Sequence, residues 1–249
     1  MDKLNKEKIL KNLPEKRVNI SIFDEIDSTN DEAKRIELNE EFQVLVAYKQ
    51  TNGRGRQGKN WLSPDSGNIY MTICTENDLS YAPASLITGL ICINSLSQLN
   101  ESLKINLKWP NDILMKNKKI GGILVEKEWI DERIKTIIGI GINLDIQNIE
   151  NKEHWWGDLS MYDFKKKRNK LINLIIQNFI KFYDEKTSWI DEWRHKCIHI
   201  DKEIEIYKDH SSHKKAIFKD INLQGDAIID TNMGTEILRS GQINIKGIY

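Results

Sequence analysis

Gly53-Arg54-Gly55-Arg56-Gln57-Gly58 is a short, cationic and glycine-rich stretch of this sequence, and Lys59 and Trp61 follow it closely. Glycine allows a tight turn and lets the backbone approach a ligand closely. Arginine and lysine add fixed positive charge and several hydrogen-bond donors. This combination favours an anionic ligand, above all a phosphate group.

The same stretch is open to further interpretations. Its spacing satisfies the G-x-G-x-x-G pattern of dinucleotide-binding folds, and an apolar run from Phe42 to Tyr48 precedes it. That fold requires a helix to begin at the last glycine, whereas Pro64 and Gly67 favour a loop. The stretch is also compatible with a solvated surface loop or with an RNA-binding Arg-Gly segment. An Arg-Gly segment of that kind normally repeats within a basic chain, and this sequence has neither property.

Composition limits the class of protein. The 249 residues can form one large domain, or a large and a small one. Lys plus Arg equals Asp plus Glu at 37 each, which argues against general binding to nucleic acids or anionic membranes. No apolar run approaches the roughly 18 residues of a spanning helix, and the charged N-terminus lacks a signal-type segment. The sequence therefore predicts a cytoplasmic protein without membrane contact.

The cysteines fit this location. Cys74, Cys92 and Cys197 are odd in number, widely spaced and without a C-x-x-C pair, so they predict neither a disulfide framework nor a zinc site. Cys74 and Cys92 lie in apolar runs, which favours buried thiols over a catalytic cysteine.

Hydrophobic periodicity predicts mixed helices and strands up to about residue 196. In the run from Lys104 to Trp109, lysine and asparagine alternate with apolar residues, so a strand would place Lys108 on its polar face. Helices are predicted over 2–13, 30–38, 84–103, 164–183 and 188–195. Strands are predicted over 19–26, 42–48, 68–75, 105–109, 113–115, 120–126 and 135–144.

Beyond residue 196 the pattern changes to five short strand-like runs over 203–208, 214–220, 227–230, 235–239 and 242–245. Turns are expected at 210–213, Gly225, Gly234 and Gly241. Five short strands in about fifty residues fit a small barrel. We therefore predict two domains, 1–196 and 197–249.

Five motifs occur in a fixed order: Asp27-Ser28-Thr29-Asn30, Gly53 to Gly58 with Trp61, Lys108-Trp109-Pro110-Asn111-Asp112, Gly121 to Glu126, and Gly139 to Asn143. Together they resemble the motifs of the biotin protein ligase family, over about residues 2–249. The resemblance implies an α+β fold of the class II synthetase-like, biotin–lipoate ligase type. In this fold a catalytic domain with a mixed β-sheet flanked by helices precedes a small C-terminal SH3-like β-barrel.

The resemblance also implies a reaction in two steps. Biotin is activated with ATP to biotinyl-5′-AMP, and biotin then passes to one lysine of the biotin carboxyl carrier protein of acetyl-CoA carboxylase or a related enzyme. The first step joins two anions and needs concentrated positive charge, to which Mg²⁺ with ATP would add. The sequence identifies no protein side chains as metal ligands.

Residue roles follow from the resemblance. Lys108, Arg54 and Arg56 would be catalytic. Biotin would contact Ser28, Thr29, Asn30, Gln50, Arg54, Gly55, Arg56, Lys108, Gly121 and Gly122. ATP and the adenylate would contact Arg54, Arg56, Gln57, Lys59, Trp61, Lys108, Asn111 and Asn143.

Plainer explanations exist for several of these residues. Thr29 and Glu32 have the spacing of a helix capping box, and Gly121 with Gly122 is compatible with a strand bulge. Asn111 and Asp112 either hold the turn after Lys108 or meet metal and phosphate, and the sequence leaves both open.

Two rival functions share parts of this pattern. A lipoate or octanoyl ligase shares the implied catalytic fold, and a biotin sensor would bind the ligand without forming an adenylate.

Some family members also carry an N-terminal DNA-binding domain. Only 18 residues precede Asn19, where the first predicted strand begins, so we expect no specific DNA binding. A homodimer through sheet edges stays open.

Overall fold

A computed structural model describes residues 2–14, 16–130, 132–150, 152–208, 212–240 and 244–246, with backbone only at 208, 212–213 and 244–246. The predicted turns over 210–213 and at Gly241 lie wholly or partly outside these residues.

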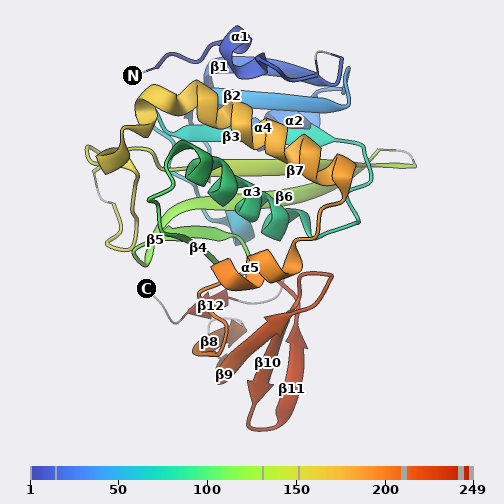
Figure 1. Cartoon of the computed structure of the whole chain (residues 1–249), viewed down its shortest axis with the longest axis vertical. Coiled ribbons are helices and arrows are strands. Elements are labelled where there is room, and N and C mark those ends of the chain that lie inside the picture. Colours follow the sequence, from blue (N-terminus) through green and yellow to red (C-terminus); the bar gives the residue numbers. More distant parts are fainter. Residues whose placement is uncertain are drawn as a thin grey trace.

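A seven-stranded mixed sheet forms the larger part of the molecule (Figure 1). β1 and β2 pair in parallel, and every other neighbouring pair is antiparallel. The predicted mixed sheet is thus confirmed. In sheet order its strands are β1 (Val18–Ile26), β2 (Phe42–Gln50), β3 (Ile69–Thr75), β7 (Arg133–Ile142), β6 (Lys118–Ile130), β5 (Asp112–Met115) and β4 (Ile105–Lys108).

Helices cover both faces of this sheet. α3 (Ala84–Leu99) and α4 (Arg168–Glu185) lie on one face, and α1 (Lys6–Leu10) packs against α4 (Figure 1). α2 (Thr29–Arg35) lies on the other face, and α5 (Ile190–Lys196) packs near β4. Single 3-10 turns occur over Arg56–Gly58, Ser160–Tyr162 and Phe164–Lys167. No described helix is both long and apolar enough to cross a membrane.

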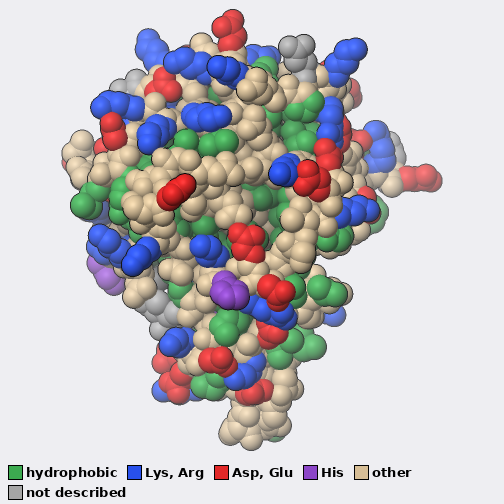
Figure 2. Space-filling model, in the orientation of Figure 1, with side chains coloured by type: hydrophobic (Ala, Val, Ile, Leu, Met, Phe, Trp, Pro, Cys, Tyr) green, Lys and Arg blue, Asp and Glu red, His purple; other side chains and the backbone are tan. Residues whose placement is uncertain are grey.

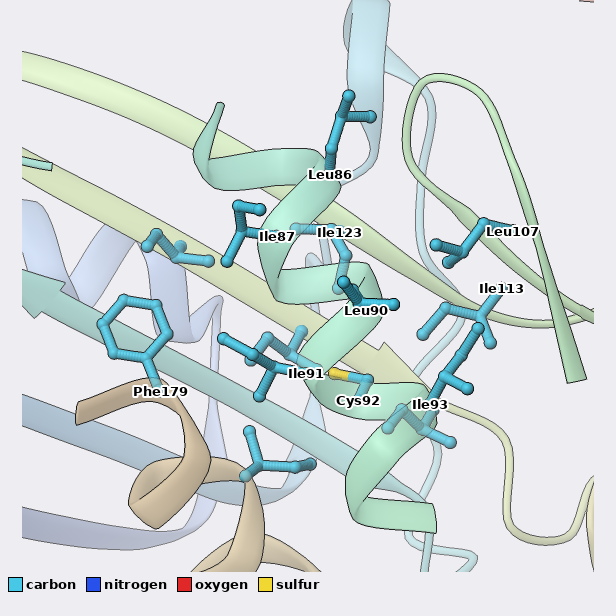
Figure 3. Packing of buried hydrophobic residues seen from close by; sticks show 14 of the residues in the cluster. Leu86, Ile87, Leu90, Ile91, Cys92, Ile93, Leu107, Ile113, Ile123 and Phe179 are labelled. Atoms are coloured by element: carbon cyan, nitrogen blue, oxygen red, sulfur yellow. The ribbon is translucent and has the colours of Figure 1, made fainter. Parts of the chain in front are cut away.

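α3 differs from the sequence expectation. Every residue from Leu86 to Ile93 is buried, so the helix is apolar all round rather than amphipathic. The sheet covers one side of it and α4 another, as the contacts of Ile87, Ile91 and Phe179 show (Figure 3). The helix also ends at Leu99, earlier than predicted, because Asn100 adopts an extended conformation.

β7 has different side chains on its two faces. Ile138, Ile140 and Ile142 join the large core. Gly139 and Gly141, which alternate with them, therefore point to the face that carries α2. Next to α2 that face is closed by Ala33, Leu45, Cys74 and Ile137. Beyond this small cluster the two glycines leave the sheet bare.

A second, smaller sheet follows residue 196. Its five antiparallel strands confirm the predicted ones, and β11 and β12 are its two edges among the described residues. Closure into a barrel stays a prediction. The strands are β8 (Lys202–Lys208), β9 (Ser212–Ile221), β10 (Ala227–Thr231), β11 (Gly234–Leu238) and β12 (Asn244–Lys246), in the order β11-β10-β9-β8-β12.

β4 and the residues after it join the two sheets. The Ile198 amide donates to the Leu107 carbonyl at 3.0 Å, and Trp109 Nε1 donates to the Gly225 carbonyl at 2.9 Å. The Trp109 ring also packs on Phe218, with centroids 6.2 Å apart. The small sheet is therefore held against the segment that carries Lys108.

We predict that Phe179→Ala lowers the free energy of unfolding by about 3–5 kcal/mol, because it removes buried apolar surface and leaves a cavity in the core. Phe179 is fully buried and packs edge-on against Phe42, at a centroid distance of 6.0 Å. Urea unfolding measures the change. Trp129→Ala is the control, since Trp129 is 75% exposed and its loss should cost less than about 0.5 kcal/mol. Equal effects of the two substitutions would contradict the assigned core.

Candidate active site

A cavity of about 1000 Å³ opens over the bare part of the large sheet, on the side of α2. Arg54 and Lys108, which are far apart in the sequence, both line it. Of the residues predicted from the sequence, it is lined by Ser28, Thr29, Asn30, Gln50, Arg54, Gly55, Arg56, Gln57, Lys59, Trp61, Lys108, Asn111, Gly122 and Asn143.

Glycines make the floor of this cavity. A Cβ on Gly139 would overlap Asn30 Oδ1, and a Cβ on Gly141 would lie 2.5 Å from the Trp61 ring. Gly122 pairs with Gly141 across β6 and β7, and its Cβ would lie 3.3 Å from Trp61. Because these glycines have no side chains, Asn30 and Trp61 can pack directly against the backbone of the sheet.

Gly121 is the predicted site residue that does not line the cavity. A Cβ on it would meet the Gly141 carbonyl at 2.9 Å and Ile113 at 3.3 Å. Because successive residues of a strand point to opposite faces, only one residue of the Gly121-Gly122 pair can face the ligand side. Gly121 serves the packing of β6 on Ile113.

One end of the cavity is a buried polar cluster at the start of α2. Ser28 is the N-cap, and its hydroxyl accepts a 3.4 Å bond from the Asp31 amide. The interpretation of Thr29 as the helix cap is therefore wrong, since the cap lies one residue earlier. The amide and the hydroxyl of Thr29 donate instead to Gln50 Oε1, at 2.8 and 3.0 Å.

Asn30 and Thr72 extend this cluster. Both are buried, and the Thr72 hydroxyl lies 2.7 Å from Asn30 Oδ1 and 2.8 Å from Thr29 Oγ1. Asn30 Nδ2 donates to Glu126 Oε2 at 2.9 Å. Thr72 and Glu126 were not among the residues predicted from the sequence, because their partners lie far away in the chain, on α2 and in the Arg-Gly loop.

The other end of the cavity is cationic. Lys108 is 6% exposed, and Arg56 Nη1 donates to Asn111 Oδ1 at 3.1 Å. Arg56 also donates to the carbonyl of Ser240, which follows β11 of the small sheet. Burial lowers the pKa of Arg56, against the opposing effect of nearby Asp112. A guanidinium stays charged under these conditions, so burial makes it a stronger partner for an anion.

Asn111 and Asp112 have structural partners. Asn111 exchanges hydrogen bonds with Ile123, its Nδ2 donating to the Ile123 carbonyl at 3.0 Å. Asp112 pairs with Lys119 at 2.6 Å. Asn111 thus holds the turn after Lys108, which was one of the two roles left open by the sequence.

Arg54 is placed nearer to the polar cluster. It pairs with Asp31 and, at 3.1 Å, with Glu126, and hydrogen bonding to Asp31 raises its pKa. The two arginines of the loop therefore point to different ends of the same cavity.

The third region of the cavity is aromatic. Trp155 and Trp156 line it in an edge-to-face pair with centroids 5.7 Å apart, and Asn143 Nδ2 donates to the Gly157 carbonyl beside them at 3.1 Å. Tyr207 of β8 also lines the cavity. Sequence reasoning assigned no chemistry to the two tryptophans, although adjacent tryptophans in a loop after a site motif were an available signal.

The described residues contain no group of three or more His, Cys, Asp or Glu side chains placed to hold a metal ion. Burial raises the pKa of the Cys74 and Cys197 thiols to about 12, so neither is a thiolate near neutral pH.

Comparison with known proteins agrees with this geometry. Residues 22–143 match the biotin/lipoate A/B protein ligase family. These residues therefore form a domain of that family. The match contains the polar cluster, the cationic loop, Lys108 and the glycine floor.

Individual relatives extend the similarity beyond these residues. The bifunctional ligase/repressor BirA of Escherichia coli is 28% identical over 241 residues, covering 90% of this chain and 75% of BirA. A biotin–[acetyl-CoA-carboxylase] ligase of Paracoccus denitrificans is 34% identical over 125 residues, 47% of this chain and 51% of that protein. The structure of Aquifex aeolicus biotin protein ligase with biotin and ATP has a TM-score of 0.75 and 26% identity, covering 92% of this chain and 98% of that one.

His199 lies buried near Lys108 but is not among the residues that line the cavity. Among the described residues neither of its ring nitrogens has a hydrogen-bond partner, and the ring stacks on Phe218 at 5.4 Å. Burial, with a smaller contribution from Lys108, lowers the pKa of His199 from 6.5 to about 3. The imidazole is therefore neutral and adds no charge to the cationic end.

We predict an acid-dependent loss of stability that depends on His199. Between about pH 6.5 and pH 3 the unfolded chain binds a proton at this residue that the folded chain does not. The free energy of unfolding therefore decreases as the pH is lowered through this range, and this loss is absent above pH 6.5. From pH 7 to pH 5, wild type should lose about 2 kcal/mol more than His199→Phe, which keeps a ring on Phe218. Urea unfolding at both pH values measures this, and identical losses would show that His199 does not titrate in this way.

Proposed function

We propose that this chain is a biotin–[acetyl-CoA-carboxylase] ligase, which activates biotin with ATP to biotinyl-5′-AMP and transfers biotin to a lysine of a biotin carboxyl carrier protein. One observation carries the proposal. A buried polar cluster, a glycine floor and two cationic segments, far apart in sequence, line one cavity. Such a cavity suits a ligand with a polar head, an apolar body and an acid group.

Biotin has these three parts. Ser28, Thr29 and Asn30 supply hydroxyl and amide groups at a buried end, where a ureido ring needs both donors and acceptors. Gln50, bonded to Thr29, is the fourth residue of this end. The fused rings would lie over the part of the floor that Gly122 lines, next to the Trp61 ring.

The carboxylate of biotin would then reach the cationic end. One of its oxygens attacks the α-phosphorus of ATP, a P–O bond forms, and pyrophosphate leaves. Lys108, Arg54 and Arg56 are the groups proposed to neutralise the charge that gathers as two anions meet, and Gly55 lines the cavity between the two arginines. Preorganised positive charge of this kind lowers the barrier without further reorganisation.

The base and sugar of the nucleotide would occupy the aromatic region. Trp61 offers a ring face for stacking and Asn143 offers an amide for adenine, while Gln57 and Lys59 stand in the same loop. Because the described residues provide no cluster of acidic ligands, Mg²⁺ would arrive bound to ATP phosphates, where it would supply further charge neutralisation.

In the second step the acceptor lysine attacks the acyl carbon of the adenylate, an amide forms, and AMP leaves. The acceptor is proposed to be a biotin carboxyl carrier protein, and the cytoplasm the site of reaction. We also retain the two units 1–196 and 197–249 and an SH3-like closure of the second one. The separate strand pairings of the two sheets support this division.

The test is incubation of the purified chain with biotin, ATP and Mg²⁺, followed by mass spectrometry for retained biotinyl-5′-AMP and by pyrophosphate exchange. Biotin-dependent exchange is expected. Exchange that responds to lipoate and not to biotin would transfer the chain to the lipoate branch of the family. Biotin binding without exchange would make it a sensor.

Lys108→Ala should reduce adenylation by at least about 100-fold, the effect of removing one transition-state donor from a preorganised site. Pyrophosphate exchange measures the rate, and thermal melting shows whether the fold is retained. Lys104→Ala is the matched control, because Lys104 precedes the same strand but is exposed. Near-normal exchange by Lys108→Ala would remove this residue from the mechanism.

A further inference from the structure

Glu126 of β6 connects two parts of the site that the sequence motifs treat separately. Its Oε2 accepts a 2.9 Å bond from Asn30, and its Oε1 accepts a 2.9 Å bond from Lys34 and forms an ion pair with Arg54 at 3.1 Å. One carboxylate therefore holds a residue of the polar cluster and a residue of the cationic loop.

The hydrogen bond between Glu126 and Asn30 determines which way the side-chain amide of Asn30 faces. A carboxylate can only accept hydrogen bonds, so the amide nitrogen must turn toward Glu126 and Oδ1 must turn toward Thr72, 2.7 Å away. Asn30 is 4% exposed, and its side chain occupies the space that a Cβ on Gly139 would take. Asn30 Nδ2 also donates a longer bond of 3.5 Å to the Leu124 carbonyl, so Glu126 supplies the shorter of the two contacts that orient this amide.

The contact with Arg54 ties the loop to the sheet. Arg54 and Lys34 face Glu126 and Asp31, so two positive and two negative groups form one balanced cluster. Arg54 lines the cavity while it makes these contacts, and two of its five N–H donors suffice for them. The pairing is consistent with a loop held over the site and not drawn away from it.

We propose that Glu126 is a positioning residue that orients Asn30 and tethers the Arg-Gly loop across the polar end of the site, so that binding of the ureido ring and closure of the loop are coupled. This inference rests on the proposed function for its ligand, biotin. The tether itself is a property of the chain without ligand and can be tested separately.

Glu126→Gln is the informative variant. Glutamine has one acceptor oxygen, so it cannot satisfy Asn30 and the pair of Lys34 and Arg54 at once. The KM for biotin in pyrophosphate exchange should rise by roughly 10-fold, the size expected for a lost hydrogen bond to a charged group, with kcat changed less than KM. Tryptic cleavage after Arg54 in the unliganded protein, followed by mass spectrometry, should become several-fold faster because the loop is released.

Two further variants complete the experiment. Asp31→Asn removes the other carboxylate partner of Arg54 but touches no contact of Asn30, so it should speed cleavage after Arg54 with a smaller rise in the KM for biotin. Glu41→Gln is the control, since Glu41 pairs with Arg17, which does not line the cavity, and it should change neither readout.

An unchanged or lower KM for biotin in Glu126→Gln would overturn the proposal, as would an unchanged rate of cleavage after Arg54. An equal rise in KM in Glu126→Gln and Asp31→Asn would overturn the coupling to Asn30. A wild-type chain without biotin-dependent exchange would count against the proposed function instead, and the cleavage rates would still decide whether the tether exists.

Discussion

The two-faced character of β7 is the constraint on which the rest of the structure depends. Ile138, Ile140 and Ile142 hold the sheet to the core, while Gly139 and Gly141 between them leave the opposite face bare. A side chain at either glycine would displace Asn30 or Trp61. The same ten-residue strand therefore stabilises the fold with one face and creates the cavity with the other.

Positive charge is concentrated locally in a chain whose net charge is zero. Both signs of charge occur over the face drawn in Figure 2, above the large sheet and on the small one. Within the cavity, three cations have defined partners. Arg54 faces Asp31 and Glu126, Lys119 faces Asp112, and Arg56 faces Asn111 and the small sheet. Such pairing fixes the cations in place before an anion arrives, which is what preorganisation requires.

Much of this was predictable from local sequence. The strands follow from runs of β-branched residues, and the turn at Lys116 and Asn117 has the positive φ angles of a tight hairpin. Predictions failed where the choice was between adjacent residues. Ser28 rather than Thr29 caps α2, and of the two glycines predicted to contact the ligand only Gly122 lines the cavity. A shift of one residue leaves composition and motif unchanged but reverses the side to which a side chain points.

The sequence by itself determined the individual strands and the position of the small second sheet through periodicity, while the mixed sheet and most cavity residues followed from the resemblance of its motifs to a known family. Only the tertiary structure decided that α3 is buried all round, that Glu126 and Thr72 support Asn30, and that Trp155, Trp156 and Tyr207 border the same cavity. These contacts join residues from separate strands and loops. Their partners are chosen by the register of the sheet and the packing of its faces, and no local pattern encodes either.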